Sequence, residues 1–431
     1  MQTARCFIVL SLAVSAAACG APAPSSPPAT GPAAATLPPP AIQTLAPATS
    51  LSEAPAAATP SAAPVTPAPT PTPPPTPTPT PAVLNPLTGL PLADPGMLNR
   101  RPLAIKVAHF PRGVRANQVG LSAADNVWEH YAEGGVTRFT AVFWGQAPER
   151  VGNVRSARLI DAILGDAYQA VLVASGSSTG TMNRLRANAD LFPRIVAEAT
   201  GYSECPLLCR EASAAETTNK LYTSPPALWQ LAETKGFGPP PALTGYAFAP
   251  APAAGGDAFA TLHFDFQLNN TIAEWRYDAA AGVYTRWIDA AGPDGLSLAA
   301  DLAPHLDAAN GQTLTAANVV VLFAPYVASN IREAEGGARY FSYDILLTGE
   351  GPAEVFRDGH RVTGRWERAD APHRLPRFVD AAGNVIALKP GVTWFEVFSA
   401  NSPVRADAAA GVYQVRFRAP DPFPATATPT P

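Results

Sequence analysis

Hydrophobic and polar positions follow two different periods in the first half of the chain. Short apolar runs typical of buried strands occupy residues 103–109 (LAIKVAH), 138–144 (RFTAVFW) and 170–176 (AVLVASG). Between them, residues 122–133 and 156–168 repeat their apolar positions every three to four residues, which predicts helices. Because strands alternate with helices, we expect an α/β domain, in which a mixed sheet is covered by helices.

The first predicted helix also carries end signals. Ser122 stands at the N-cap position, and Asp125 follows three residues later, as in a capping box. Gly134 and Gly135 come directly after the helical pattern, where glycine commonly ends a helix. These signals predict a helix that begins at Ser122 and ends before the glycine pair.

The second half of the chain changes to a period of two. After residues 238–258, which are rich in Pro, Ala and Gly, LHFDFQ (262–267), AEWRYD (273–278) and VYTRWI (283–288) alternate residue by residue. This alternation is typical of half-exposed strands. The pair Asp358-Gly359 is a hairpin signal. We therefore expect a mostly antiparallel β domain.

Composition adds a long segment outside both domains. Residues 20–82 hold one charged residue, Glu53, and no aromatic residue, and Pro and Thr dominate their second half. Such a segment cannot bury enough apolar surface to offset the entropy of ordering, so we expect a disordered stalk. The predicted organisation is a lipoprotein-type signal (1–19), the disordered Pro/Thr/Ala-rich stalk (20–82), the α/β domain (83–237), a linker (238–258), the β-rich domain (259–420) and a disordered tail (421–431).

The N-terminus resembles an export signal. An apolar run from Phe7 to Ala18 follows Arg5, is too short to span a bilayer, and ends in small residues. The sequence AAAC that ends at Cys19 resembles a lipobox, so Cys19 is the candidate for acylation. The alternative is ordinary cleavage and secretion. We favour an extracytoplasmic protein that Cys19 anchors to the cell membrane.

Charge and cysteine content narrow the class of protein. The net charge is −4, and no cluster of Lys and Arg forms a basic stripe, which argues against a nucleic-acid partner. Cys205 and Cys209 form a C-x-x-x-C pair without a histidine within thirty residues. In an exported chain this spacing favours a local disulfide over a metal or redox site.

Several segments resemble the YerB-like lipoprotein family of bacteria. They are NPLTGLP (85–91), GLSAADNVWEHYAEGGVTRFTAVF (120–143), VGNVRSAR (151–158) and NKLYT (219–223), with WRYD, YTRW and GVTWFEVF in the second half. The resemblance implies a membrane-anchored extracytoplasmic protein with an α/β domain and a β-rich domain, and supplies no established reaction. The chain departs from the family pattern at Asn153, where a proline is expected, and near Ala174, where a histidine is expected.

A candidate anion site lies where the second predicted helix begins. Arg155 and Arg158 are three residues apart, so a helix would place them on one face. Ser156 could cap the first turn, and Arg138 begins the preceding strand. Guanidinium groups beside the free N–H groups of a helix start suit a phosphate or carboxylate. The alternative is internal pairing with the protein's own carboxylates, for which the candidates are Asp125, Glu129, Glu133 and Asp161.

A second candidate contact is the turn after the strand at 170–176. Its small and hydroxyl residues could let backbone N–H groups approach a ligand, although an ordinary strand-to-helix turn is the favoured interpretation. The residues of this turn are Ser175, Gly176, Ser177 and Ser178.

The sequence contains no recognisable catalytic signature. It lacks a G-x-S-x-G elbow, and its six histidines are scattered, so we name no catalytic residue, metal ligand or cofactor. The leading hypothesis is an envelope lipoprotein that binds an anionic envelope component or a protein partner. The alternative is an envelope enzyme acting on a lipid-linked phosphorylated glycan, because the strand-end arginine before a helix is similar to the LytR–CpsA–Psr phosphotransferases.

Overall fold

The computed structural model describes most of the chain beyond the predicted stalk. The predicted signal, Cys19, the stalk up to residue 81 and the tail lie outside the described residues. The described residues are 82–211, 220–240, 242–251, 255–266, 271–291, 298–333, 340–371 and 373–420.

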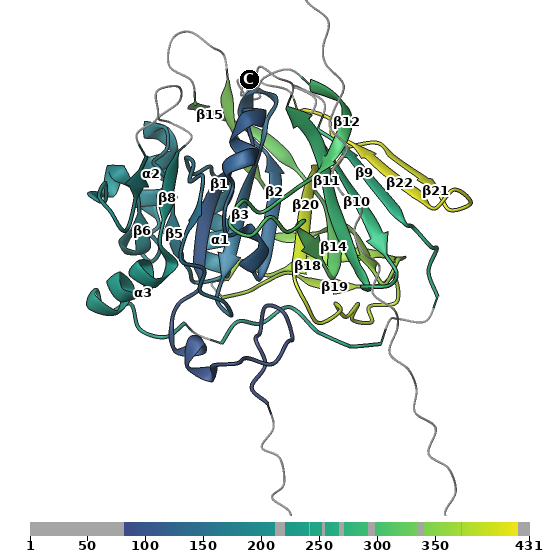
Figure 1. Ribbon diagram of the computed structural model, residues 1–431, viewed down its shortest axis with the longest axis horizontal. Coiled ribbons are helices and arrows are strands. Elements are labelled where there is room, and N and C mark those ends of the chain that lie inside the picture. Colours follow the sequence, from purple (N-terminus) through teal and green to yellow (C-terminus); the bar gives the residue numbers. More distant parts are fainter. Residues whose placement is uncertain are drawn as a thin grey trace, which may run out of the picture. The chain divides into compact units, whose positions relative to one another are not determined.

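A ten-stranded mixed sheet is the largest element of the fold (Figure 1). Strands β14, β20 and β2 are parallel to one another, as are β1, β5 and β6, and the remaining pairs are antiparallel. In spatial order the strands are β19 (Arg377–Val379), β18 (His360–Arg368), β17 (Gly349–Arg357), β14 (Asn318–Ala324), β20 (Thr393–Ser399), β2 (Asn126–Tyr131), β3 (Thr137–Phe143), β1 (Leu103–Ala108), β5 (Val171–Val173) and β6 (Ile195–Val196).

The second large sheet has antiparallel pairs except for the parallel pair β9–β22. Its strands, in order, are β12 (Leu298–Pro304), β11 (Val283–Ala291), β10 (Ile272–Asp278), β9 (Thr261–Asp265), β22 (Val412–Arg416) and β21 (Val404–Asp407), and β13 (Thr315–Ala316) pairs with β11. A two-stranded ribbon consists of β15 (Tyr326–Arg332) and β16 (Phe341–Ile345), and a small three-stranded sheet of β4 (Val151–Gly152), β8 (Leu221–Thr223) and β7 (Cys209–Arg210).

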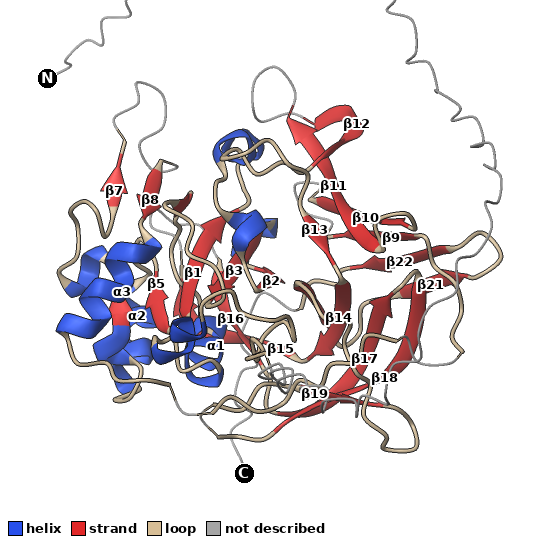
Figure 2. Cartoon of the chain, turned by 60° about the horizontal axis from the view of Figure 1, so that its bottom comes forward, coloured by secondary structure: helices blue, strands red, loops and turns tan. Residues whose placement is uncertain are grey.

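The α-helices of the described residues lie together near β5 (Figure 2). All of them belong to the first half of the chain, as the sequence pattern predicts. The α-helices are α1 (Ile160–Ala167), α2 (Thr179–Ala187) and α3 (Pro225–Thr234), and the 3-10 helices are η1 (Pro95–Asn99), η2 (Arg112–Asn117), η3 (Leu121–Ala123), η4 (Glu133–Gly135), η5 (Phe192–Arg194) and η6 (Glu198–Thr200).

The fold class expected from the sequence is confirmed. The first half is a mixed arrangement of strands and helices, and the second half consists mostly of antiparallel strands. The sequence pattern does not show that the two halves share a sheet. Strand β20 lies between β14 and β2 and joins strands of both halves in the ten-stranded sheet.

The predicted helix at 122–133 is wrong. Residues 126–131 form the central strand β2. Asp125, which resembles a capping-box residue in the sequence, instead accepts hydrogen bonds from the backbone N–H groups of Trp144 and Gly145, at 2.5 and 2.8 Å. The strand is buried on both faces, so it has no polar side to produce simple alternation. Its buried charged residues imitate the polar positions of an amphipathic helix.

The second predicted helix is shorter than expected. Residues 156–159 precede α1 and are not helical, so Ser156 does not cap it. The side chain of Asp161 instead accepts the backbone N–H of Arg158 at 2.6 Å. This bond fixes the chain just ahead of the helix and aims the Arg158 side chain towards η4.

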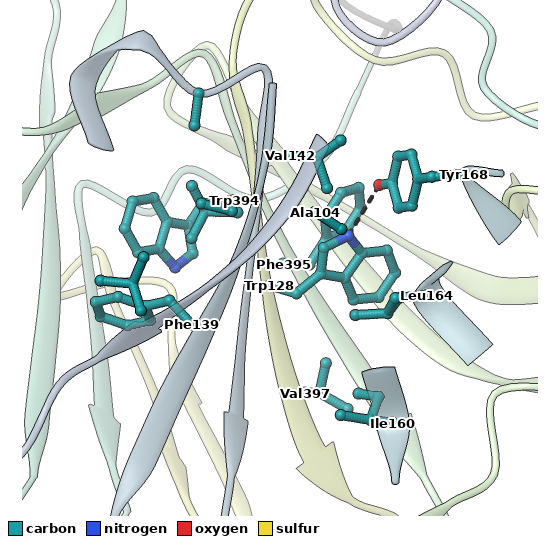
Figure 3. Close-up of a cluster of buried hydrophobic side chains, with 14 of the residues drawn as sticks. Ala104, Trp128, Phe139, Val142, Ile160, Leu164, Tyr168, Trp394, Phe395 and Val397 are labelled. Carbon is teal, nitrogen blue, oxygen red and sulfur yellow. Dashed lines mark hydrogen bonds between the residues drawn. The ribbon is translucent and has the colours of Figure 1, made fainter. Parts of the chain in front are cut away.

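Two layers of core cover the two faces of the ten-stranded sheet (Figure 3). On one face, Trp128 stacks on Phe395 with ring centroids 4.2 Å apart and donates a hydrogen bond to the Tyr168 hydroxyl at 2.8 Å. On the other face, Trp394 meets Trp275 of the second sheet at 5.1 Å. Helix α1 and Tyr168 therefore cover the first face, and the second sheet packs on the opposite one.

Candidate anion-binding site

Two buried arginines and one glutamate form the centre of the site. Arg158 donates through Nε to Glu133 Oε2 at 2.5 Å and also pairs with Glu133 through Nη2. Arg138, in β3, lies with Nη2 3.6 Å from Glu133 Oε1 and donates through Nη1 to the Ser156 carbonyl at 2.8 Å. Both guanidinium groups are almost inaccessible to solvent, with 9% of Arg138 and 7% of Arg158 exposed. Internal pairing, one of the two interpretations of the sequence, is therefore present for both arginines.

Backbone hydrogen bonds join the turn at residues 175–178 to the segment 155–158. The Ser175 N–H donates to the Arg155 carbonyl at 3.0 Å, and the Ala157 N–H donates to the Gly176 carbonyl at 2.8 Å. The hydroxyls of Ser156 and Ser175 lie 3.3 Å apart. The two segments that the sequence singled out, 155–158 and 175–178, are thus held side by side.

The start of α2 supplies hydroxyl groups to the site. Ser178 caps the helix, because its Oγ accepts the backbone N–H of Thr181 at 3.2 Å. The hydroxyls of Ser178 and Thr181 both donate to Glu333 Oε1, at 3.0 and 2.6 Å. Glu333 Oε2 in turn lies 3.5 Å from Arg158 Nη1. A carboxylate from the second half of the chain therefore completes the site.

A buried lysine, Lys106, contacts the same Asp161 that binds the backbone of Arg158. Lys106 Nζ contacts His130 Nε2 at 2.6 Å, Thr140 Oγ1 at 2.9 Å and Asp161 Oδ1 at 2.9 Å, and Thr140 donates to the same aspartate oxygen at 2.7 Å. Burial lowers the pKa of Lys106 to about 8, although Asp161 opposes the change. Burial and the nearby Lys106 charge lower the pKa of His130 to about 3. At neutral pH the group is therefore a lysine–aspartate ion pair next to a neutral histidine.

Cationic side chains and carboxylates meet in the described part of the site. Its cationic side chains are Lys106, Arg138, Arg155 and Arg158, and its carboxylates are Glu133, Asp161 and Glu333. Burial and the neighbouring charges of Arg158 and Arg155 lower the pKa of Arg138 to about 9, despite the opposing effect of the glutamates. Burial disfavours the carboxylate of Glu133, yet Arg158 and Arg138 lower its pKa to about 2.

The structure brings together most of the residues proposed from the sequence. Asp125 is an exception, because it lies at the opposite end of β2, bound to Asn85 and two backbone N–H groups, and burial raises its pKa to about 6. Glu129 is the other exception, since it points to the opposite face of the sheet and pairs with Arg286. The residues that meet are Glu133, Arg138, Arg155, Ser156, Arg158, Asp161, Ser175, Gly176, Ser177 and Ser178.

Sequence reasoning missed four members of the site. Lys106 had a visible signal, because it is the one charged residue of the apolar run 103–109 and a buried lysine needs a partner. His130 was hidden by the mistaken helix, and Thr140 is a common strand residue that gives no signal of its own. Glu333 had no signal at all, because it is separated from Arg158 by 175 residues of chain.

A second buried polar network lies on the opposite face of the sheet. Arg286 donates to Glu129 Oε2 at 2.5 Å, to Glu396 Oε1 at 3.0 Å and to His305 Nδ1 at 3.1 Å. Trp275 also donates to Glu396 Oε1, at 2.9 Å. Burial and the charge of Glu129 raise the pKa of Glu396 well above its ordinary value, so this carboxyl keeps its proton. The network is enclosed between the two sheets and joins both halves of the chain.

Other features of the described residues concern the cysteines, metal ligands and membrane spans. Cys205 and Cys209 are joined by a disulfide. Within the described ranges, no group of three or more His, Cys, Asp and Glu side chains could hold a metal ion. No helix in this part of the chain is long and apolar enough to cross a membrane.

The fold and its two domains are those of a protein family of unknown function. The model for the "Protein of unknown function (DUF3048) N-terminal domain" matches residues 87–238, and that for the corresponding C-terminal domain matches residues 262–395. The chain belongs to the YerB-like family, as its sequence resemblance indicated.

The YerB protein of Bacillus subtilis is similar to this chain both in sequence and in structure. The protein named "Putative lipoprotein YerB" of strain 168 is 28% identical over 314 residues, which are 72% of this chain and 85% of the relative. The crystal structure of the YerB protein matches with a TM-score of 0.58 and 27% identity, and the match covers 73% of this chain and 96% of that chain. The likeness therefore extends over both domains.

Proposed function

We propose that this protein is an extracytoplasmic lipoprotein that Cys19 anchors to the cell membrane and that binds an anionic component of the envelope. Two findings support the anchor, namely the lipobox-like residues that end at Cys19 and the lipoprotein name of the relative. The site would lie at Arg138, Arg155 and Arg158. Neither the matched families nor the described residues favour the alternative of a phosphotransferase.

The burial of Arg138 beside Arg158 carries the proposal for an anionic ligand. Arg138 is buried, and its pKa is lowered by that burial and by the repulsion of the two neighbouring arginines. Burying a guanidinium group without full compensation is unfavourable, and an oxyanion offers both charge and hydrogen-bond acceptors. Glu133 and Glu333 compensate Arg158 more fully than Arg138, since the pKa of Arg158 is raised. The neighbourhood of Arg138 is therefore where a ligand would add most.

A calorimetric titration of the full chain with pyrophosphate tests the ligand. We expect wild type to bind and Arg155→Ala to bind about tenfold more weakly, because a hydrogen bond to a charged group contributes about 1.5–3 kcal/mol. Arg377→Ala is the control, since this arginine is largely exposed in β19, at the opposite edge of the sheet. Absence of binding by wild type, or equal losses in the two variants, would refute the anion site.

Fractionation of cells tests the anchor separately. With wild type we expect the protein in the membrane fraction, and with Cys19→Ala we expect it in the soluble extracytoplasmic fraction, because the acyl group would have no attachment point. A Cys6→Ala variant controls for loss of a cysteine from the signal region. If Cys19→Ala stayed in the membrane fraction, the proposed anchor would be wrong.

A further inference from the structure

The second large sheet ends in a short, exposed strand. β21 is the last strand in the order of that sheet, where it pairs with β22. All four of its residues, Val404–Asp407, are exposed, and Figure 1 shows the β21–β22 hairpin at the outer margin of the fold, in yellow. Its register with β22 contains no shift, so no bulge turns the strand away from a neighbour. β21 is therefore an open edge to which another strand can be added.

The hydrogen-bond pattern fixes which backbone groups of β21 face outward. The Arg416 N–H donates to the Pro403 carbonyl at 3.1 Å, so these two opposite residues form a hydrogen-bonded pair. Hydrogen-bonded and non-hydrogen-bonded pairs alternate along an antiparallel ladder. The N–H and carbonyl groups of Val404 and Ala406 consequently point away from β22. In the described part of the chain, no other strand pairs with them on that side.

The exposed side chains of this edge carry one charge of each sign. Arg405 and Asp407 point to one face of the strand, and Val404 and Ala406 point to the other. The Oδ1 atom of Asp407 accepts the backbone N–H of Ala410 at 3.0 Å, which leaves Oδ2 for an outside donor. β21 thus offers a cation and an anion two residues apart.

These charges select one way of pairing two copies of β21. When two antiparallel copies place Ala406 opposite Ala406, the outward groups of both residues exchange two hydrogen bonds. Arg405 of each copy then lies opposite Asp407 of the other, in a non-hydrogen-bonded pair, where side chains are closer. A register shift of two residues in either direction places Arg405 opposite Arg405, or Asp407 opposite Asp407. Opposite charges therefore favour the register centred on Ala406 over its two neighbours.

The same charges have an alternative use, because charged residues on an edge strand often prevent association. A strand with charges of a single sign repels a second copy in every register. β21 instead carries opposite charges at a spacing that becomes complementary when the second strand runs in the reverse direction. Its sequence therefore discriminates among strands and does not exclude all of them.

We propose that β21 is the docking edge for a second copy of this chain. Two β21 strands pair in antiparallel orientation about Ala406, and the two seven-stranded sheets form one continuous sheet across the dimer. A four-residue strand gives a contact well below the about 1,200–2,000 Å² of a stable interface, so the dimer is weak and depends on protein concentration. The inference is independent of the candidate anion site.

Charge reversal tests the pairing, because a second reversal can cancel the first. Arg405→Asp gives β21 two negative charges, and Asp407→Arg gives it two positive charges, so each variant repels its own copies. An equimolar mixture of the two variants restores both opposite pairs. All of these proteins are full-length chains that also carry Cys6→Ala and Cys19→Ala, so that neither N-terminal thiol cross-links two chains.

Sedimentation equilibrium over a concentration series measures the association. We expect the parent chain and the mixture to dimerise, and each variant alone to dimerise about tenfold more weakly, because two opposite pairs become two like pairs. Arg186→Asp is the matched control, since it makes the same change of charge at an exposed position of α2. We expect this control to dimerise like the parent.

Ala406→Pro tests the backbone separately from the charges. Proline removes the outward N–H, which makes no bond to β22, and an edge strand tolerates proline at such a position. We expect this variant to lose the dimer and to keep the β21–β22 hairpin.

Each outcome decides for or against the docking edge. Weak association of both single variants, with recovery in their mixture, supports pairing about Ala406. A parent chain that stays monomeric at every concentration overturns the proposal and leaves the edge to a strand of another protein. Association that is unchanged in both single variants overturns it as well, because the contact then lies elsewhere on the chain. A mixture that associates no better than its components excludes the antiparallel register.

Discussion

His130 and Glu129 are neighbours in β2, and their side chains are buried on opposite faces of the ten-stranded sheet. His130 faces the helices and is neutral beside the Lys106–Asp161 pair. Glu129 faces the second sheet, where Arg286 neutralises it. Removing one partner of a buried ion pair leaves an unpaired charge and costs about 3–5 kcal/mol. Adjacent positions of one strand therefore depend on partners from distant parts of the chain.

The Glu129–Glu396 pair makes stability depend on pH. These residues are directly opposite each other on the parallel strands β2 and β20, where two like charges would repel. Glu396 therefore keeps its proton in the folded protein, and its pKa lies well above the unfolded value of about 4.3. Above that pH the unfolded state loses the proton first, so this group lowers the free energy of unfolding as pH rises.

Replacing Glu396 with Gln should remove this dependence. The glutamine oxygen can still accept from Trp275 and Arg286, and its neutral amide takes the place of the protonated carboxyl beside Glu129. We expect the stability of Glu396→Gln relative to wild type to increase steadily between about pH 4.5 and pH 8. Urea unfolding at a series of pH values measures this difference, with the exposed Glu350→Gln as control. A difference that does not change with pH would mean that Glu396 is ionised in the folded protein.

At the scale of elements, periodicity predicted the half-exposed strands of the second sheet better than the central strand β2. Strands β9, β10 and β11 alternate as the sequence indicates, because one of their faces is partly exposed. β2 is buried on both faces, so its charged residues mark ion pairs and not a solvated side. Sequence spacing alone cannot tell a solvated charge from a buried, paired one, since the partners come from other elements.

The candidate site shows the same limit. The arginines and the serine turn were predictable, because they lie at the ends of recognisable strands in adjacent segments. The sequence does not tell whether the arginines face carboxylates or a ligand. The answer depends on where η4 places Glu133 and where the β15–β16 ribbon places Glu333. Local sequence thus indicates the cationic half of the site, and tertiary packing supplies the other half.

The hairpin between β17 and β18 was predicted and is confirmed. Arg357 pairs with His360, and the two turn residues Asp358 and Gly359 have φ angles of 55° and 76°, as a type I′ turn requires. Only residues that tolerate a left-handed conformation suit both positions. The Asp-Gly pair is a specific signal because it depends on the backbone conformation that these residues tolerate and not on which side chains are buried.

Gly359→Ala should destabilise the protein through two effects. The left-handed conformation disfavours alanine by about 1–2 kcal/mol, and the new Cβ would lie 2.8 Å from Tyr277 Cδ1. Gly383→Ala is the matched control, because Gly383 has a φ angle of 87°, but a Cβ atom added there would have no neighbouring atom within 4 Å. We expect a larger loss in urea unfolding for Gly359→Ala. Equal losses would show that the Tyr277 ring moves away without cost.

At the scale of the whole molecule, the two matched domains share one sheet. β2 comes from the N-terminal match, and β14 from the C-terminal match, while β20 lies between them and pairs with both along most of its length. Arg286 of β11 adds a buried bridge, since it contacts Glu129 of β2 and Glu396 of β20. The hydrogen-bond ladder and the ion-pair network therefore couple the halves more tightly than a linker would.

This coupling predicts a single unfolding transition for the folded part of the chain. In differential scanning calorimetry we expect one peak whose calorimetric and van't Hoff enthalpies agree, as they do for a cooperative unit. Arg286→Met should lower the stability by about 3–5 kcal/mol, because it leaves the buried Glu129 carboxylate without its cation. It should move the whole peak and not divide it, since the shared β14–β20–β2 ladder remains. Two peaks in wild type, or a peak that splits in Arg286→Met, would mean that the two matched domains unfold separately despite their common sheet.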